Sequence, residues 1–161
     1  MSRFVQASGG VAGQAETMSM ITSVVPRLVL DGADRAIAFY QQAFGAELVE
    51  RFTGPGDVVV YAELRVGEHR IAVKDADQVD AAATTLGGSP VLFMLDVPDA
   101  DAVAAAFESA GATVVFPLDN ADYGYRQARL RDPFGLSWMV SQRLETLEPA
   151  QTQARLDTEL R

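Results

Sequence analysis

Residues 45–49 read GAELV and residues 111–115 read GATVV. Each stretch directly follows a segment in which apolar residues recur at the spacing of an amphipathic helix, at 33–44 and at 99–110. Glycine ends a helix readily because it adopts a left-handed backbone conformation without steric penalty, and the β-branched residues nearby favour a strand. The same unit of helix, glycine and strand therefore occurs twice in this chain.

The sequence on either side of both units predicts further strands. One β-rich apolar run precedes each helix, and two more runs follow the strand after each glycine, with turn residues between them. A strand, a helix and three strands in the same order indicate a duplicated βαβββ module. The predicted strands are 24–30, 46–52, 58–66 and 70–74 in the first module, and 91–97, 112–116, 126–131 and 136–141 in the second.

Composition divides the chain into a central domain and two peripheral ends. Residues 1–23 are rich in Ser, Gly, Gln, Ala and Thr without periodicity, which predicts a flexible N-terminal extension. Pro149 suits the first turn of a helix and predicts a short C-terminal helix within 143–161. The central domain, 24–142, comprises a first module at 24–75, a polar, alanine-rich linker at 76–89 and a second module at 90–142.

Length and composition exclude several classes of protein. The 161 residues suit one domain or two small fused repeats, and 48% hydrophobic against 22% charged residues is typical of a globular fold. The net charge of −9 disfavours nucleic acid and anionic membranes as partners, and no apolar run approaches the roughly 20 residues that span a bilayer. Cysteine is absent and His69 is the sole histidine, which excludes disulfides, thiol nucleophiles and multi-histidine metal sites within one chain. We expect a cytoplasmic protein.

Four short motifs resemble the vicinal oxygen chelate superfamily, which includes glyoxalase I, bleomycin-resistance proteins, extradiol dioxygenases and fosfomycin-resistance enzymes. They are VLDGADRAIAFY at 29–40, GAE at 45–47, AELRVG at 62–67 and RDPFG at 131–135. The glyoxalase/bleomycin-resistance branch is the most similar. The resemblance implies an α+β fold of two tandem βαβββ modules, whose curved mixed sheets enclose a ligand cavity. The modules of this superfamily pair within one chain or across two, and we expect a homodimer.

The metal site of this superfamily is poorly matched by the sequence. Carried over by motif, its four ligand positions fall on Val25, Glu63, Leu92 and Met139. Valine, leucine and methionine lack the hard oxygen and imidazole donors that Zn²⁺, Ni²⁺, Mn²⁺ and Fe²⁺ require. The sequence therefore predicts a metal-independent protein without a cofactor.

Period-2 alternation in the strands predicts which side chains line the cavity. In the strand 58–66 we expect Val60, Ala62 and Leu64 to pack on the helix, which leaves the intervening residues for the other face. An apolar floor with a few polar groups is the usual composition of a small-molecule site. The predicted ligand-binding residues are Arg27, Tyr61, Glu63, Arg65, Leu92, Met94, Asp96, Tyr123, Tyr125, Gln127, Arg129 and Met139.

Glu63 is the strongest single candidate for a binding or catalytic role. A carboxylate in the middle of a sheet must be paired, solvated or shifted in pKa. An ion pair with Arg27 or Arg65 would explain Glu63 without any function. Similarly, we expect His69 to be a solvated hairpin residue and Trp138 to pack in the core.

Two functions from different classes remain open. In the first, as the resemblance implies, the protein binds and sequesters a drug or secondary metabolite and gives antibiotic resistance without chemistry. In the second, it is an enzyme such as a lyase, isomerase or cyclase, with Glu63 as the general base. Arg27 and Arg65 would then hold a carboxylate or enolate. A metal-dependent glyoxalase-type or dioxygenase-type enzyme would require a different strand register.

Overall fold

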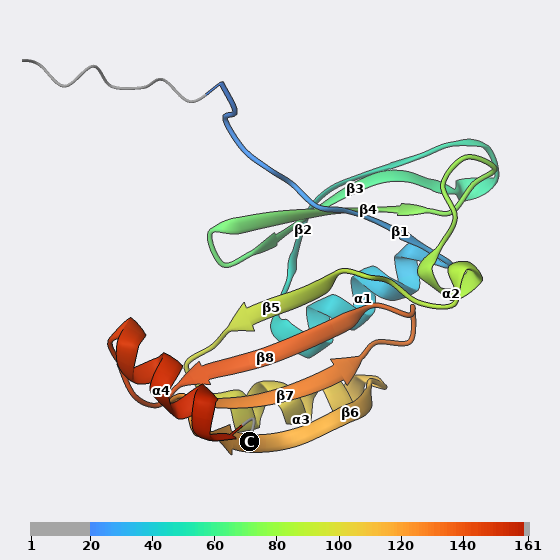
Figure 1. The fold of residues 1–161 in the computed structure, drawn as a ribbon. Coiled ribbons are helices and arrows are strands. Elements are labelled where there is room, and N and C mark those ends of the chain that lie inside the picture. Colours follow the sequence, from blue (N-terminus) through green and yellow to red (C-terminus); the bar gives the residue numbers. More distant parts are fainter. Residues whose placement is uncertain (1–19, 160–161) are drawn as a thin grey trace, which may run out of the picture.

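The structure is a computed structural model that describes residues 20–159, so most of the predicted N-terminal extension lies outside the described residues. No helix in this range is long and apolar enough to cross a membrane. The first module comprises β1, α1, β2, the short 3-10 turn η1, β3 and β4, and the second comprises β5, α3, β6, β7 and β8 (Figure 1). The elements are β1 (Arg27–Leu30), α1 (Ala33–Phe44), β2 (Glu47–Thr53), η1 (Pro55–Asp57), β3 (Val59–Val66), β4 (His69–Asp75), α2 (Ala83–Leu86), β5 (Leu92–Asp96), α3 (Ala100–Ala110), β6 (Thr113–Ala121), β7 (Tyr125–Arg131), β8 (Ser137–Arg143) and α4 (Pro149–Glu159).

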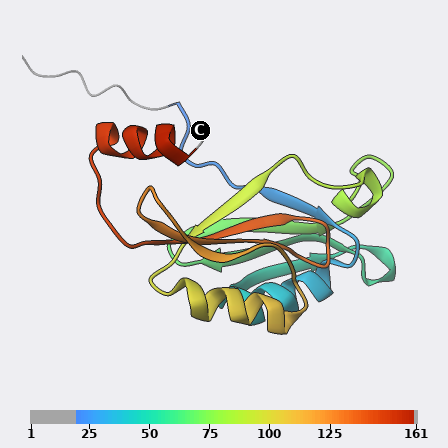
Figure 2. The same ribbon diagram turned by 60° about the horizontal axis from the view of Figure 1, so that its bottom comes forward.

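The strands form two four-stranded mixed sheets, ordered β1-β4-β3-β2 and β5-β8-β7-β6. In each sheet the first strand of the module pairs parallel with the last strand, and the other neighbours are antiparallel. The predicted α+β fold of two βαβββ modules is confirmed. Figure 2 shows α1 and α3 together on one side of the sheets and α4 on the other. We call the side of each sheet that faces away from α1 and α3 its open face.

The two sheets do not close around a cavity, and in this respect the expectation from the resemblance is wrong. Both sheets carry their helix on the same side, so their open faces do not face each other (Figures 1 and 2). Within residues 20–159, no strand pairing joins one sheet to the other. The reason is that the modules meet through their helices, which leaves each open face without a cover from the other module.

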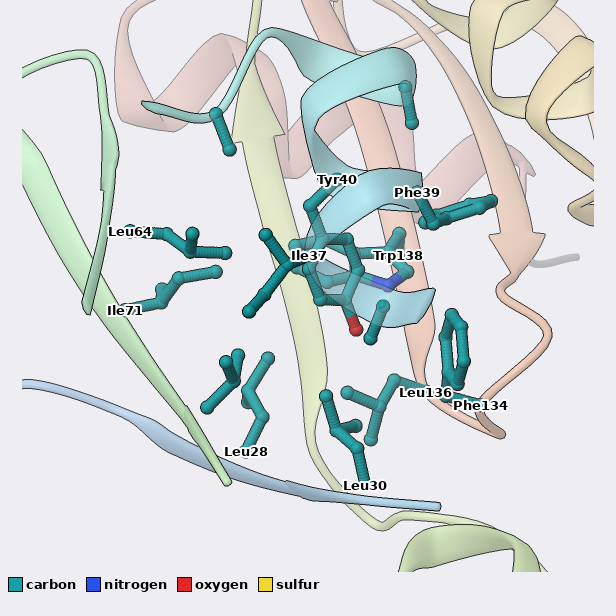
Figure 3. Close-up of a cluster of buried hydrophobic side chains, with 14 of the residues drawn as sticks. Leu28, Leu30, Ile37, Phe39, Tyr40, Leu64, Ile71, Phe134, Leu136 and Trp138 are labelled. Carbon is teal, nitrogen blue, oxygen red and sulfur yellow. The ribbon is translucent and has the colours of Figure 1, made fainter. Parts of the chain in front are cut away.

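The contact between modules is an aromatic core between α1 and α3. The ring of Phe107 on α3 lies 5.8 Å from that of Phe39 and 5.6 Å from that of Phe44, both on α1. Trp138 of β8 closes the cluster, with its ring 6.0 Å from Phe107. Figure 3 shows α1 side chains such as Tyr40 between apolar residues of the first sheet and residues of the second. Trp138 is 1% exposed, so its predicted place in the core is confirmed.

Asp132 is a buried carboxylate that ties the second module to α1. Its Oδ2 accepts hydrogen bonds from the Tyr40 hydroxyl and from Nε1 of Trp138, both at 2.9 Å. Its Oδ1 accepts from the backbone N–H groups of Phe134 and Leu136, also at 2.9 Å. Burial and the charge of Asp132 raise the pKa of Tyr40 well above its ordinary value, so the hydroxyl keeps the proton that it donates. The Asp-Pro-Phe-Gly turn therefore connects the modules as well as reversing the chain.

One predicted strand face needs correction. Phe52 pairs with Tyr61 and Thr53 with Val59, so Val60 is an extra residue in β3, a β-bulge. The bulge turns Val59 toward the core and leaves Val60 45% exposed, contrary to the prediction for Val60. Beyond the bulge the alternation holds, and the other two predicted residues pack on the helix side.

The C-terminal helix α4 is anchored to the turn between β6 and β7. Arg155 on α4 forms a bidentate ion pair with Glu145, at 2.7 and 2.9 Å, and donates a further hydrogen bond to the Asp122 carbonyl at 2.9 Å. The backbone N–H of Glu145 in turn donates to the Gly124 carbonyl. This turn leads directly into the second open face, so α4 lies at the edge of that face (Figure 2).

Candidate functional site

The predicted site residues lie in two separate groups, one on each sheet. The first-module group is on β1 and β3, and the second-module group is on β5, β7, β8 and the turn before β7. No hydrogen bond, ion pair or ring contact within residues 20–159 joins the two groups. The first group is Arg27, Tyr61, Glu63 and Arg65, and the second is Leu92, Met94, Asp96, Tyr123, Tyr125, Gln127, Arg129 and Met139.

Glu63 lies in the middle of β3, with a side chain that is 13% exposed. Its Oε2 accepts a hydrogen bond from the Tyr61 hydroxyl at 3.1 Å and lies 3.3 Å from Nη1 of Arg70. Burial, and then Glu63 itself, raise the pKa of Tyr61, so the phenol stays a donor. The arginine that pairs with Glu63 is therefore Arg70, rather than Arg27 or Arg65 as considered from the sequence.

The two arginines expected beside Glu63 have other partners. Arg27 donates from Nη2 to the Val60 carbonyl at 2.6 Å, and its guanidinium lies 5.5 Å from the centre of the Tyr61 ring. Arg65 forms an exposed ion pair with Glu47 on β2. The Val60 carbonyl is available because the bulge takes it out of the β2–β3 ladder. Neither arginine is oriented by Glu63.

In the second group, the Tyr123 hydroxyl donates to Oε1 of Gln127 at 2.6 Å, and Nε2 of Gln127 donates to Oγ of Ser141 at 2.9 Å. The amide of Gln127 is thus fixed at both ends, and its orientation follows from this network. Nearby, Arg143 donates to the Tyr125 hydroxyl at 3.1 Å and lies over that ring. These contacts orient the polar side chains before any ligand binds.

The rest of the second group is apolar around a single arginine. Met94 on β5 pairs with Met139 on β8, and Met139 pairs in turn with Arg129 on β7. Met94 is 60% exposed, as is Phe116 on β6, whose ring lies 5.6 Å from the Arg129 guanidinium. Methionine and aromatic side chains that remain exposed beside polar groups are typical of small-molecule sites.

A further pocket of about 300 Å³ is lined by residues of β4 from the first module and of β5 and β8 from the second. Its wall is mainly apolar and includes Phe44, Phe93 and Trp138 from the core between the modules. His69 and Arg70 stand at its edge. His69 is exposed at the start of β4, next to the hairpin turn, as the sequence predicts. This pocket brings together residues of both modules that the sequence did not connect.

Sequence reasoning missed Arg70 and Phe116 as members of the open faces. The signal for Arg70 was the two-residue turn at 67–68, which pairs Arg65 with Arg70 and so places both on one face. The sequence predicts Phe116 as the last residue of a strand, whereas β6 continues to Ala121 through two register shifts. Irregular strands of this kind leave no regular alternation to follow.

The residues at the four expected metal positions do not fit a metal. Glu63 is the one oxygen donor, and Tyr61 and Arg70 already occupy its Oε2. Leu92 and Met139 lie on the second sheet and supply no hard donor. Among residues 20–159, no three His, Cys, Asp or Glu side chains are grouped so that they could hold an ion.

Comparison with known proteins agrees with this architecture. The sequence profile of the Glyoxalase/Bleomycin resistance protein/Dioxygenase superfamily matches residues 21–140. The chain belongs to this superfamily.

Among its superfamily relatives, an uncharacterized protein of Mycobacterium tuberculosis is 33% identical over 153 residues, which are 91% of this chain and 90% of that protein. The X-ray structure of a gene product from Arabidopsis thaliana has a TM-score of 0.62 and 26% identity, and it covers 75% of this chain and 98% of its own. An antibiotic binding protein from a Streptomyces species has a TM-score of 0.57 and 20% identity, over 78% of this chain and 99% of its own. The antibiotic binding protein therefore shares the fold of this chain.

Proposed function

We propose that this protein binds a small organic molecule, of the drug or secondary-metabolite class, on the open faces of its sheets. The observation that carries the proposal is the exposure of large apolar side chains there. Phe52, Met94 and Phe116 are 54%, 60% and 60% exposed beside oriented polar groups. Large apolar side chains that stay exposed beside polar groups are costly in water and are typical of binding surfaces. The antibiotic binding protein with the same fold supports a drug-like ligand.

The binding is metal-independent in this proposal, because the donor set at the superfamily positions does not fit an ion. The protein would sequester its ligand in the cytoplasm and so give resistance to it, without a reaction. Tyr123, Gln127 and Ser141 on the second open face are already oriented by hydrogen bonds to one another, and this preorganisation suits recognition.

A homodimer completes the site in this proposal. Among the residues that the structure describes, neither module covers the open face of the other, and a second copy placed over it would give two equivalent cavities. We expect sedimentation or light scattering at micromolar concentration to give twice the mass of the 161-residue chain. A monomer under these conditions would contradict the proposed closure and leave the ligand on an open surface.

An enzyme remains the second candidate, because Glu63 is a shielded carboxylate in the middle of an open face. The test begins with a thermal-shift screen of drug-like compounds and continues with a confirmed ligand. If Glu63 binds a positively charged group of that ligand, Glu63→Gln should weaken binding by about 1–3 kcal/mol, the scale of a charged hydrogen bond. If it is a general base, turnover should fall by roughly 10²–10⁴-fold with KM little changed.

Glu47→Gln is the matched control for this experiment. Glu47 faces the same side of the first sheet, but it pairs with Arg65 in an exposed ion pair. Its loss should change neither binding nor turnover, since exposed pairs contribute little. If Glu63→Gln lowers only the melting temperature, Glu63 is simply the partner of Tyr61 and Arg70, and both functional roles of this residue are wrong.

A further inference from the structure

The side chain of Arg129 has no carboxylate partner among residues 20–159. The sequence has 22 acidic and 13 basic residues, so carboxylates outnumber the basic side chains with which they could pair. In residues 20–159, no ion pair or hydrogen bond involves the side chain of Arg129, although its backbone pairs with Phe116 and Met139 in the sheet. The basic residues that do form ion pairs in this range are Arg51, Arg65, Arg70, Lys74, Arg126 and Arg155.

The position of Arg129 makes this lack of a partner informative. It lies in the middle of β7 with Met139 on one side and Phe116 on the other, and its guanidinium is held over the Phe116 ring at 5.6 Å. Its Nε is shielded from solvent and, alone among the described buried side-chain nitrogen and oxygen atoms, has no hydrogen-bond partner. A shielded charged donor without an acceptor is unfavourable, so an acceptor is expected to arrive with a ligand.

The pocket beside Arg129 has a volume of about 270 Å³. Its apolar wall is formed by Phe116, Pro117 and Met139, which offer a flat ring and an adaptable thioether. Asp119 also lines the pocket, but its carboxylate accepts from the backbone N–H of Asn120 and forms no ion pair with Arg129. Among the residues described as lining this pocket, the buried polar atom without a hydrogen-bond partner is therefore Nε of the Arg129 guanidinium, a positively charged donor.

We propose that this pocket binds a planar aromatic ligand that carries a carboxylate. The carboxylate accepts hydrogen bonds from the Arg129 guanidinium, whose planar fork matches it. The ring lies against Phe116 and Met139. This inference rests on the proposed small-molecule binding and adds the chemical class of the ligand at the second open face.

The experiment compares three probes with one ring system: 2-naphthoate, 2-naphthamide and 2-naphthylmethylammonium. NMR of protein with ¹³C-labelled methionine methyl groups follows Met139, whose signal is assigned with Met139→Leu. We expect 2-naphthoate to shift this signal saturably and to bind at least about tenfold more tightly than the amide, with the ammonium weakest, as for a charged hydrogen bond. Arg129→Gln should remove the preference for the acid.

Arg131→Gln is the matched control, because Arg131 is exposed at the end of the same strand and lies outside the pocket. It removes the same charge and should keep the preference. Arg129→Lys retains the charge without the planar fork and should give an intermediate preference. If Arg129→Gln does not fold, this lysine variant and the three probes on the unmodified protein still decide the question.

Two results separate this inference from the proposed function. If the amide or the ammonium binds as tightly as 2-naphthoate, or if Arg131→Gln also removes the preference, the assignment of an acid to Arg129 is overturned while small-molecule binding stands. The assignment is also overturned if no naphthalene probe shifts Met139 but a compound from the thermal-shift screen binds elsewhere. If neither the probes nor the screen gives a ligand, the proposed function fails as well.

Discussion

Replacement of Asp132 by alanine is expected to lower the free energy of unfolding by about 4 kcal/mol. The change removes the carboxylate that accepts four hydrogen bonds. The Tyr40 hydroxyl, the Trp138 indole N–H and two backbone N–H groups then lose their acceptor. Each unsatisfied buried donor costs roughly 1–3 kcal/mol, partly relieved where the structure relaxes or water enters. Because Tyr40 belongs to the first module, the loss should also weaken the contact between modules.

Urea unfolding, followed by the fluorescence of Trp138, which is the sole tryptophan, and by circular dichroism, measures this loss. Tyr40→Phe removes one donor and keeps the carboxylate, so it should cost only about 1–2 kcal/mol. Asp101→Ala, which breaks an exposed ion pair with Arg126, should change the free energy of unfolding far less, because solvent screens the pair. A loss at Asp132 no greater than that at Asp101 would contradict the role of this carboxylate.

Truncation of Phe107 to alanine is expected to cost about 3–5 kcal/mol. Phe107 is completely buried on α3, and its ring contacts Phe39 and Phe44 on α1 and Trp138 on β8. The cavity left by the ring cannot close fully, because the aromatic side chains around it are held by two different elements, α1 and β8. We expect the same urea experiment to show the loss and hydrogen exchange to rise along both helices.

Phe52→Ala is a matched control that removes the same side chain from an open face. Phe52 is 54% exposed, and among residues 20–159 its ring stacks on Tyr61 alone, at 6.3 Å between ring centres. Its loss should cost less than about 1 kcal/mol, since little apolar area leaves water on folding. Equal losses at the two phenylalanines would mean that the helix contact does not hold the modules together. A ligand of the first sheet should bind Phe52→Ala less tightly.

Local sequence features predicted most of the secondary structure. Helix 33–44 was predicted at its observed bounds, because apolar spacing and the terminating Gly45 are both local signals. The second helix, predicted at 99–110, has Asp99 as its N-cap, whose side chain accepts from the backbone of Ala102. Strand ends were less accurate, and β6 runs five residues beyond its predicted end at Phe116, to Ala121, because its bulges follow no period.

The candidate site was only partly predictable. Alternation indicated that Glu63, Arg129 and Met139 lie away from the helices, since side-chain direction in a strand follows from residue number alone. The partners of these residues depend on neighbouring strands. Glu63 pairs with Arg70 because the β3–β4 hairpin sets the register there.

The sequence by itself determined the two modules, because helix periodicity, strand alternation and glycine stops are properties of neighbouring residues. Only the tertiary structure decided how the modules meet. The contact of Tyr40 with Asp132 joins residues far apart in the chain, and no local pattern encodes the distance between them. The packing of α1 against α3 in turn fixes the direction of both open faces. Long-range packing therefore left the sheets open and Arg129 without a partner, which the residue order could not indicate.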